Sequence, residues 1–206
     1  MRAISPKRVA IVGPGALGCL LATTLCRIGG DIWVLDHDSQ RAALLRHSGL
    51  TLERAGRREH FSLQATADPR QIGRVDLVLL CVKSPALART LPSLLPLLTK
   101  NTLLLAWQNG ICHLPILLKA QLPCPVALAV TSLGAHLAGP GRVRFGGEGT
   151  TSLGFWGDAS PEARLALEGA AELFRRAGLA VRVEADILVQ VWNKLLVNVG
   201  INALTA

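Results

Sequence analysis

The sequence predicts an α/β protein with a doubly wound, mainly parallel sheet that helices cover on both faces. Two observations lead to this fold class. Short runs rich in Val, Ile and Leu alternate with helical stretches along the chain, and fully apolar strands of this kind are typical of buried parallel sheets. In addition, half of the 206 residues are hydrophobic and only 17% are charged, so the chain can bury a sizeable core.

The order of the elements follows from local patterns. Apolar runs predict strands at residues 8–12, 31–35, 76–82, 102–107, 125–131 and 180–183. Helical patterns predict helices at residues 16–28, 39–47, 85–98, 161–177 and from 185 onward. Because Pro92 and Pro96 lie inside the third of these helices, we expect it to be irregular.

Turn and cap signals separate these elements. The helix at 16–28 runs into Gly29-Gly30, a usual stop, and the helix at 39–47 can take Ser39 or Asp38 as its cap. Residues 50–65 predict a two-stranded hairpin that turns at Ala55-Gly56. The Gly-rich, alternating stretch 133–154 predicts further β-hairpins.

The net charge of +8 has two interpretations. It is compatible with an ordinary soluble basic protein, and it would also attract anions such as nucleotide phosphates or carboxylate substrates. Nucleic acid is the weaker hypothesis, because the basic residues are scattered apart from Arg54, Arg57 and Arg58, and few aromatic side chains are available for stacking on bases. We therefore expect no nucleic-acid partner.

The cysteines and the N-terminal residues indicate the cellular compartment of the protein. The five cysteines are an odd number without a CxxC pair, which favours a reduced cytoplasmic protein over a disulfide scaffold or a zinc site. The basic start and the uncharged stretch 9–26 could pass for a signal peptide or membrane span. Gly13-Pro14-Gly15 interrupts any continuous helix there, so we expect neither export nor a membrane partner.

A glycine-rich turn follows the first predicted strand and opens the first helix. Its residues are Gly13, Pro14, Gly15, Ala16, Leu17 and Gly18. In this context the GxGxxG spacing predicts a Rossmann-type dinucleotide site, because the glycines allow a tight turn and a close approach to a pyrophosphate at a helix N-terminus. The alternative is a glycine-rich turn without a ligand.

Asp36 ends the second predicted strand, where an acidic side chain can accept hydrogen bonds from the ribose hydroxyls of a dinucleotide. A carboxylate there repels a 2′-phosphate, so Asp36 favours NAD(H) over NADP(H). His37 and Arg41 are close enough to help to hold a phosphate, which keeps NADP(H) as an alternative. Asp36 could also be a loop residue or a helix cap.

Further polar residues follow two other strands. Lys83 comes directly after one buried strand, and Gln108-Asn109-Gly110 follows the next. Because ligands of open α/β sheets bind outside the carboxyl ends of the strands, we expect both segments to face one crevice.

The last predicted helix carries Lys194, Asn198 and Asn202 on one stripe, because residues four apart share a helix face. The lysine could be a surface residue whose charged end reaches water. With two asparagines beside it, a polar cleft is the better interpretation, in which the ammonium donates a proton to a carbonyl oxygen while a hydride arrives at carbon.

The chain resembles ketopantoate reductase (2-dehydropantoate 2-reductase) over nearly all of its length. The resemblance rests on VAIVGPGALG, on CVKS at 81–84, on QNG at 108–110, on VTSLGAHLAGPGRVRFGGEG at 130–149, and on VWNKLLVNVGINALTA at 191–206. The last segment is the most specific, and the ordered set is stronger than any one piece.

The resemblance implies a Rossmann domain over residues 1–184 and a helical substrate and dimerisation domain that begins at 185–206. It implies reduction of a small anionic 2-oxo acid, 2-dehydropantoate, to (R)-pantoate with NAD(P)H, on the route to pantothenate and coenzyme A. Lys194 looks like the catalytic acid, Asn109 like the residue that positions substrate and nicotinamide, and Lys83 like a cofactor contact. The implied substrate-binding residues are Asn109, Asn198 and Asn202.

Two departures from the family matter. Members commonly use NADP(H) with a basic residue after the second strand, whereas His37 stands there and follows Asp36. Members also continue into further helices, so the resemblance implies that this chain lacks most of its C-terminal domain, through which a homodimer would form. A related 2-oxo or 2-hydroxy acid dehydrogenase, or a non-catalytic dinucleotide-binding module, remain as alternatives.

Overall fold

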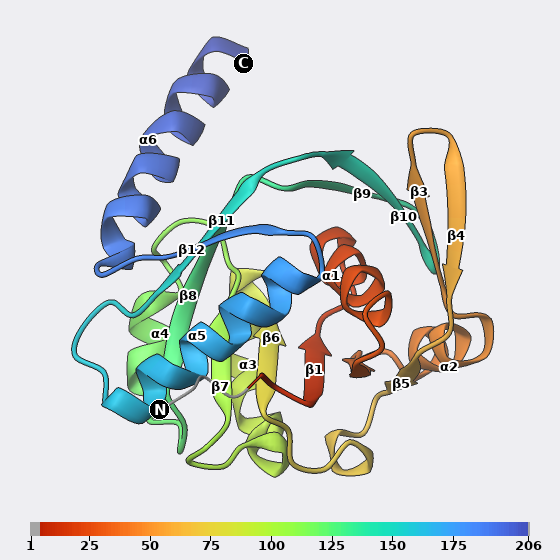
Figure 1. Cartoon of the computed structure of the whole chain (residues 1–206), viewed down its shortest axis with the longest axis horizontal. Helices are drawn as coiled ribbons and strands as arrows, with labels where there is room; N and C mark the ends of the chain where they lie inside the picture. Colours follow the sequence, from red (N-terminus) through yellow and green to blue (C-terminus); the bar gives the residue numbers. More distant parts are fainter. Residues whose placement is uncertain (1–4, 206) are drawn as a thin grey trace.

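The computed structural model describes residues 5–205, and it describes the side chains of residues 5–200. Within this part of the chain the main sheet has eight strands (Figure 1). Their order across the sheet is β12 (Ala180–Val183), β11 (Thr150–Gly154), β8 (Val126–Thr131), β7 (Leu103–Ala106), β6 (Leu77–Leu80), β1 (Arg8–Val12), β2 (Asp31–Leu35) and β5 (Gln64–Thr66).

The main sheet is parallel except at β11, which pairs antiparallel with β8 and parallel with β12. From β1 the chain first builds β2 and β5 on one side and then crosses to β6 on the other. The strand order therefore reverses between β1 and β6, and a crevice opens at the carboxyl ends of strands at such a switch point. This confirms the predicted fold class and places the expected ligand cleft at the end of β1.

Alternate residues of β1 enter two separate cores. Val9 and Ile11 are buried with α1 (Ala16–Cys26) and α5 (Pro161–Arg176), whereas Ala10 and Val12 are buried on the opposite face. That second face is covered by α3 (Leu87–Ser93), α4 (Leu114–Lys119) and the start of α6 (Ile187–Thr205). A strand with apolar residues on both sides can bury both, because successive side chains point to opposite faces.

A second sheet, which the sequence analysis did not predict, lies over α1 (Figure 1). Its order is β4 (Arg57–Phe61), β3 (Leu50–Arg54), β10 (Arg142–Gly147) and β9 (Gly134–Gly139). Both hairpins were expected, and the β3–β4 turn falls at Ala55-Gly56, both with positive φ. The pairing of β10 parallel to β3 joins segments about ninety residues apart, which no local pattern could indicate.

Several boundaries differ from the predicted ones for clear reasons. Asp38, not Ser39, caps α2 (Ser39–Ser48) by accepting hydrogen bonds from the backbone of Gln40 and Arg41. The segment expected at 85–98 divides into η2 (Ser84–Ala86), α3 and η3 (Leu95–Leu97) around its prolines. The remaining short elements, β5, α4 and η1 (Pro69–Gln71), were not predicted.

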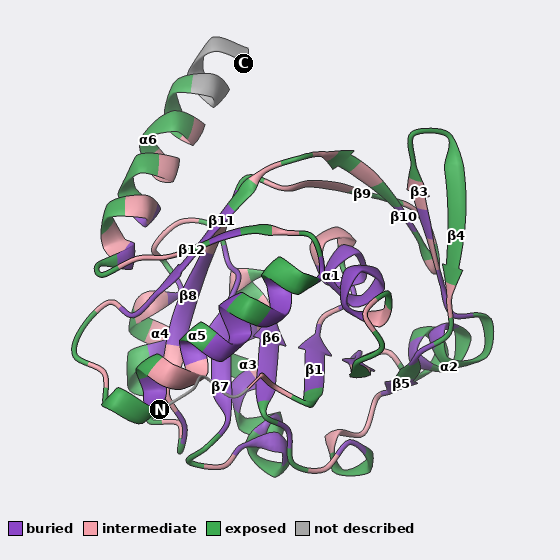
Figure 2. Cartoon of the chain, viewed as in Figure 1, coloured by how far each residue is buried: buried purple, intermediate pink, exposed green. Residues whose placement is uncertain are grey.

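Helix α6 leaves the body of the protein after its first turns (Figure 1). Ile187 and Val191 are buried against the main sheet, whereas residues 192–200 are exposed or half-buried (Figure 2). The large apolar side chains exposed along α6 are Val189, Trp192, Leu196, Val197 and Val199. None of the helices in the described part of the chain is long and apolar enough to span a membrane.

The exposed apolar face of α6 should make the 206-residue chain self-associate, because contiguous exposed apolar surface favours contact with a second molecule. Trp192 is 50% and Leu196 69% exposed, and they lie one helical turn apart. Light scattering after size exclusion should show dimers or larger species at micromolar concentration, and Trp192→Glu with Leu196→Glu should reduce them. A strictly monomeric wild-type chain would contradict this expectation.

Candidate active site

The turn between β1 and α1 is built around close backbone packing. Gly13 has φ 91°, and a Cβ there would lie 2.8 Å from the Val82 side chain. A Cβ on Gly18 would overlap the Gly13 carbonyl oxygen. Gly15, by contrast, would meet nothing within 4 Å. Two of the glycines are therefore required by packing, and the third keeps space open beside the N-terminus of α1.

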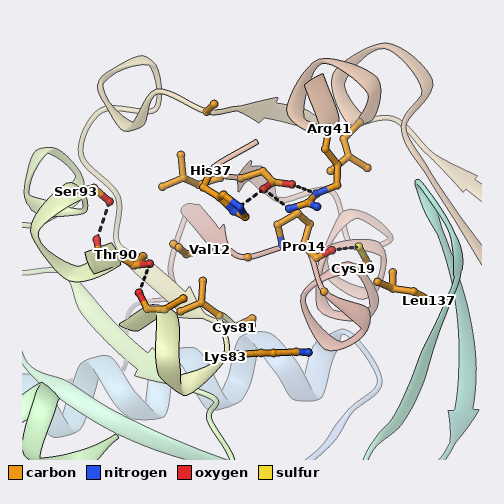
Figure 3. Close-up of a pocket in the computed structure, with 18 of the residues that line it drawn as sticks. Val12, Pro14, Cys19, His37, Arg41, Cys81, Lys83, Thr90, Ser93 and Leu137 are labelled. Atoms are coloured by element: carbon orange, nitrogen blue, oxygen red, sulfur yellow. Dashed lines mark hydrogen bonds and ion pairs between the residues drawn. The ribbon is translucent and has the colours of Figure 1, made fainter. Parts of the chain in front are cut away.

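A cleft of about 880 Å³ lies beside this turn, at the carboxyl ends of β1, β2 and β6 (Figure 3). This volume lies within the usual range for a small-molecule or cofactor site. Gly13, Pro14 and Gly15 line it, whereas Ala16, Leu17 and Gly18 lie in the first turn of α1 behind them and do not. Gly15 stands at the N-cap of α1 and offers no side-chain cap, so the first N–H groups of the helix remain available to an anion.

Asp36 is paired rather than free. Its carboxylate accepts from the guanidinium of Arg41, with 2.6 Å from Nη2 to Oδ1, and from the backbone N–H of Asp38 at 3.1 Å. The hydrogen bond to Asp36 raises the pKa of Arg41. The Asp36 side chain has no exposed surface, while that of Arg41 is 42% and that of His37 76% exposed. The groups presented to the cleft are thus His37 and Arg41.

This pairing changes the premise on which Asp36 was expected to favour NAD(H). The sequence argument treated Asp36 as an open carboxylate that would repel a 2′-phosphate. The first turn of α2 instead brings Arg41 onto both carboxylate oxygens, so the negative charge is compensated. The sequence pattern placed Asp36 at the end of β2, beside the cleft, as the structure does, but it did not indicate that Arg41 pairs with this carboxylate.

Lys83 and Gln108 follow neighbouring strands but differ in their exposure to solvent. Lys83 is exposed and lines the cleft, on the other side of Pro14 from His37 and Arg41 (Figure 3). Gln108 is buried, and neither it nor its neighbours Asn109 and Gly110 line this cleft, contrary to expectation. Its Nε2 donates to the backbone oxygens of Leu80 and Val82, each at 2.9 Å, and so ties the end of β7 to the end of β6.

Lys194 reaches from α6 to the ends of β7 and β8. Its Nζ donates to Oδ1 of Asn109 and to the backbone oxygen of Thr131, both at 2.6 Å. Burial lowers the pKa of Lys194. A lysine that merely reaches toward water would not make two such contacts, and the structure thereby brings together Lys194 and Asn109, 85 residues apart. Thr131 was missed because its contribution is a backbone carbonyl, which no side-chain pattern reveals.

Of the two asparagines on the predicted stripe, the structure describes the side chain of one. Asn198 is half-buried, one turn beyond Lys194 on the same helix face. Asn202 lies outside the residues whose side chains the structure describes. Across the described residues, no group of three or more His, Cys, Asp or Glu is arranged to hold a metal ion.

The sheet topology, the glycine turn and the cleft define a Rossmann-type α/β domain. The chain belongs to the ketopantoate reductase PanE/ApbA family, whose model matches residues 9–158. It is 34% identical over 202 residues to the 2-dehydropantoate 2-reductase of Halobacterium salinarum, covering 97% of this chain and 65% of that protein. The corresponding protein of Archaeoglobus fulgidus is 31% identical over 205 residues, covering 97% of this chain and 64% of the relative.

Solved structures agree with this assignment. The crystal structure of 2-dehydropantoate 2-reductase from Geobacter metallireducens GS-15 superposes with a TM-score of 0.84 at 30% identity, covering 97% of this chain and 65% of that one. A ternary structure of D-mandelate dehydrogenase with NADH and anilino(oxo)acetate has a TM-score of 0.83 at 26% identity, covering 93% and 61%. The chain thus spans 63% to 65% of the length of the curated relatives that it matches.

The glycine turn allows packing and binding to be separated by two matched substitutions. Gly18→Ala should lower the free energy of unfolding by about 1–3 kcal/mol, because its Cβ overlaps the Gly13 carbonyl. Gly15→Ala should leave the thermal unfolding midpoint almost unchanged and weaken coenzyme binding, because its methyl occupies space that only a ligand needs. Thermal unfolding and coenzyme titration of both variants measure these effects. Normal coenzyme binding by Gly15→Ala would show that the pyrophosphate does not approach this turn.

Proposed function

We propose that the chain forms the coenzyme-binding part, and part of the catalytic site, of an oxidoreductase that reduces 2-dehydropantoate to (R)-pantoate. The observation that carries this proposal is that the Lys194 ammonium is held between Asn109 and Thr131, at the carboxyl ends of β7 and β8. The same sheet forms the dinucleotide cleft. The family and the names of the curated relatives support the choice of substrate.

The residues present suit a nicotinamide dinucleotide. Open space at Gly15 and uncapped N–H groups at the start of α1 fit a pyrophosphate, and His37 and Arg41 stand where the adenosine ribose would lie. The coenzyme, when bound, supplies the hydride. Lys83 adds a cation to the same cleft and helps to hold the anionic ligands there.

Lys194 is proposed as the acid of the reaction. Negative charge develops on the carbonyl oxygen as the hydride arrives at carbon, and a positioned ammonium stabilises this charge and donates its proton. Burial lowers the pKa of Lys194 and so makes that proton easier to release. Asn109 orients the ammonium through its Oδ1, and Asn109, Asn198 and Asn202 are proposed to bind the substrate.

We propose further that α6 opens a helical domain that completes the substrate cleft and provides a homodimer contact. The greater length of the relatives and the exposed apolar face of α6 support this assignment of residues 185–206 to a second unit. Substrate contacts from that unit would set specificity. A related 2-oxo acid is the second candidate substrate, favoured by the similarity to D-mandelate dehydrogenase. Steady-state rates with 2-dehydropantoate and with aromatic 2-oxo acids distinguish the two.

Coenzyme preference should follow the groups that face the cleft. Because Asp36 is paired and Arg41 is accessible, we expect NADPH to bind more tightly than NADH. Arg41→Ala should weaken NADPH binding by about ten- to a hundredfold, equivalent to about 1–3 kcal/mol for a charge-assisted contact, and should affect NADH much less. Titration by tryptophan fluorescence measures all four dissociation constants.

The exposed Arg46, on the same helix, provides the matched control for this titration. Arg46→Ala should leave both coenzymes unaffected. Because Arg41→Ala also removes the guanidinium from the buried Asp36 carboxylate, the thermal stability of this variant must be measured alongside. Tighter binding of NADH by the wild-type chain would instead support the hypothesis that Asp36 gives up Arg41 and accepts from the ribose hydroxyls.

In an enzyme whose substrate cleft is complete, Lys194→Ala should lower kcat by about 10²–10⁴-fold while coenzyme dissociation constants stay unchanged, because a positioned acid acts in the transition state. Lys194→Arg should restore little, since a guanidinium does not give up its proton readily. In the wild type, kcat should fall as the pH rises through the lysine pKa, below the ordinary value of 10.5. Asn193→Ala, at the exposed neighbouring position, is the control. A rate for Lys194→Ala close to wild type would leave Lys194 with a structural role only.

A further inference from the structure

A recess of about 10 Å³, separate from the dinucleotide cleft, lies beside Lys194. It is lined by Gln108 and Asn109 at the end of β7, by His113 before α4, and by Val191 and Lys194 of α6, with β8 as its floor. A volume of this size has room for about one water molecule.

Buried polar atoms without partners face this region. His113 is 1% exposed, and neither of its ring nitrogens has a hydrogen-bond partner in the described part of the chain. Oε1 of Gln108 is also buried and unpartnered there, although its Nε2 makes two hydrogen bonds. Leaving such buried groups unsatisfied is destabilising, so a shared partner would be favoured.

The donors and acceptors around the recess are complementary. Lys194 has three N–H donors, of which Asn109 and Thr131 take two. A neutral imidazole offers one donor and one acceptor, and burial lowers the pKa of His113, which keeps the ring neutral. Of the residues that line the recess, His113 and Lys194 are the ionisable ones.

We propose that one water molecule occupies this recess and links Lys194 to His113 and Gln108, so that His113 is a positioning residue for the proposed acid. The water accepts the third N–H of Lys194, and it donates to Oε1 of Gln108 and to the unprotonated ring nitrogen of His113. Every hydrogen-bonding group of the cluster except the remaining imidazole N–H then has a partner.

This arrangement assigns a direction to the ammonium and rests on the proposed function of Lys194. The Thr131 carbonyl and the water hold Nζ from inside the protein, while Asn109 is exposed toward solvent. The N–H that bonds to Asn109 is therefore the one from which a substrate oxygen can accept a hydrogen bond. His113 acts through Lys194 and does not itself contact the substrate.

The linkage between His113 and Lys194 can be tested without any activity. Nitrogen-15 spectra of the imidazoles, with His113 assigned from the signal lost in His113→Phe, should show that Lys194→Met shifts both ring nitrogens of His113. The pKa of His113 should rise, because removal of a nearby cation favours protonation. Lys119→Met, at an exposed position on α4, is the matched control and should leave His113 unchanged. Unchanged His113 signals in Lys194→Met would overturn the proposal.

The positioning role is tested by kinetics. His113→Phe should lower kcat with 2-dehydropantoate by about 10- to 100-fold, the effect of a small misplacement, with coenzyme dissociation constants unchanged. His113→Gln, whose amide keeps a donor and an acceptor, should recover most of the rate. His136→Phe, an exposed histidine on β9, should behave as wild type. Equal losses in His113→Phe and His113→Gln that track thermal stability would show a purely structural role and overturn the proposal.

The two proposals fail in different ways. If Lys194→Ala keeps its activity, the proposed acid is wrong, while the nitrogen-15 comparison still decides whether His113 and Lys194 are linked. If Lys194→Ala is inactive and the His113 signals ignore Lys194→Met, the acid stands and the water link is wrong.

Discussion

The close approach of backbone at the first turn is the constraint on which the rest of this structure depends. Gly13 lies against Val82 and Gly18 against the Gly13 carbonyl, so α1 can begin directly over the end of β1 only because both positions lack a Cβ. That placement aims the N-terminus of α1 at the crevice between β1 and β6. The same contact brings the end of β6, and with it Lys83, to the opposite side of the cleft.

The environment of each charged side chain in this protein is decided by packing, not by the overall composition. The excess of basic residues on its own says only that anions are favoured as ligands. In the structure, Arg41 compensates the buried Asp36 and still lines the cleft, whereas Arg54 of the second sheet lies over the Phe145 ring and pairs with Glu148, just after β10. Arginines of similar appearance in the sequence thus line a cleft in one case and link neighbouring segments of the second sheet in the other.

The candidate catalytic group arises from three separate segments. Asn109 follows β7, Thr131 ends β8, and Lys194 lies in α6, and the main sheet brings the first two side by side because β7 pairs with β8. The first turns of α6 pack against β8 and β11, and Ile187 and Val191 are buried there. An ammonium held in this way is partly desolvated, which both lowers its pKa and fixes its direction.

The sequence by itself determined the parallel α/β fold, nearly every strand of the main sheet and the glycine turn. These features rest on short-range signals, namely apolar periodicity, glycine spacing and residues that follow strand ends. Only the tertiary structure decided that β10 pairs with β3, that Arg41 takes the carboxylate of Asp36, that Gln108 turns inward, and that His113 is buried beside the recess at Lys194. The contact between Arg41 and Asp36 is local and depends on the first turn of α2. The other contacts depend on which segments distant in the chain become neighbours, and on the hydrogen-bonding groups that burial leaves to be satisfied.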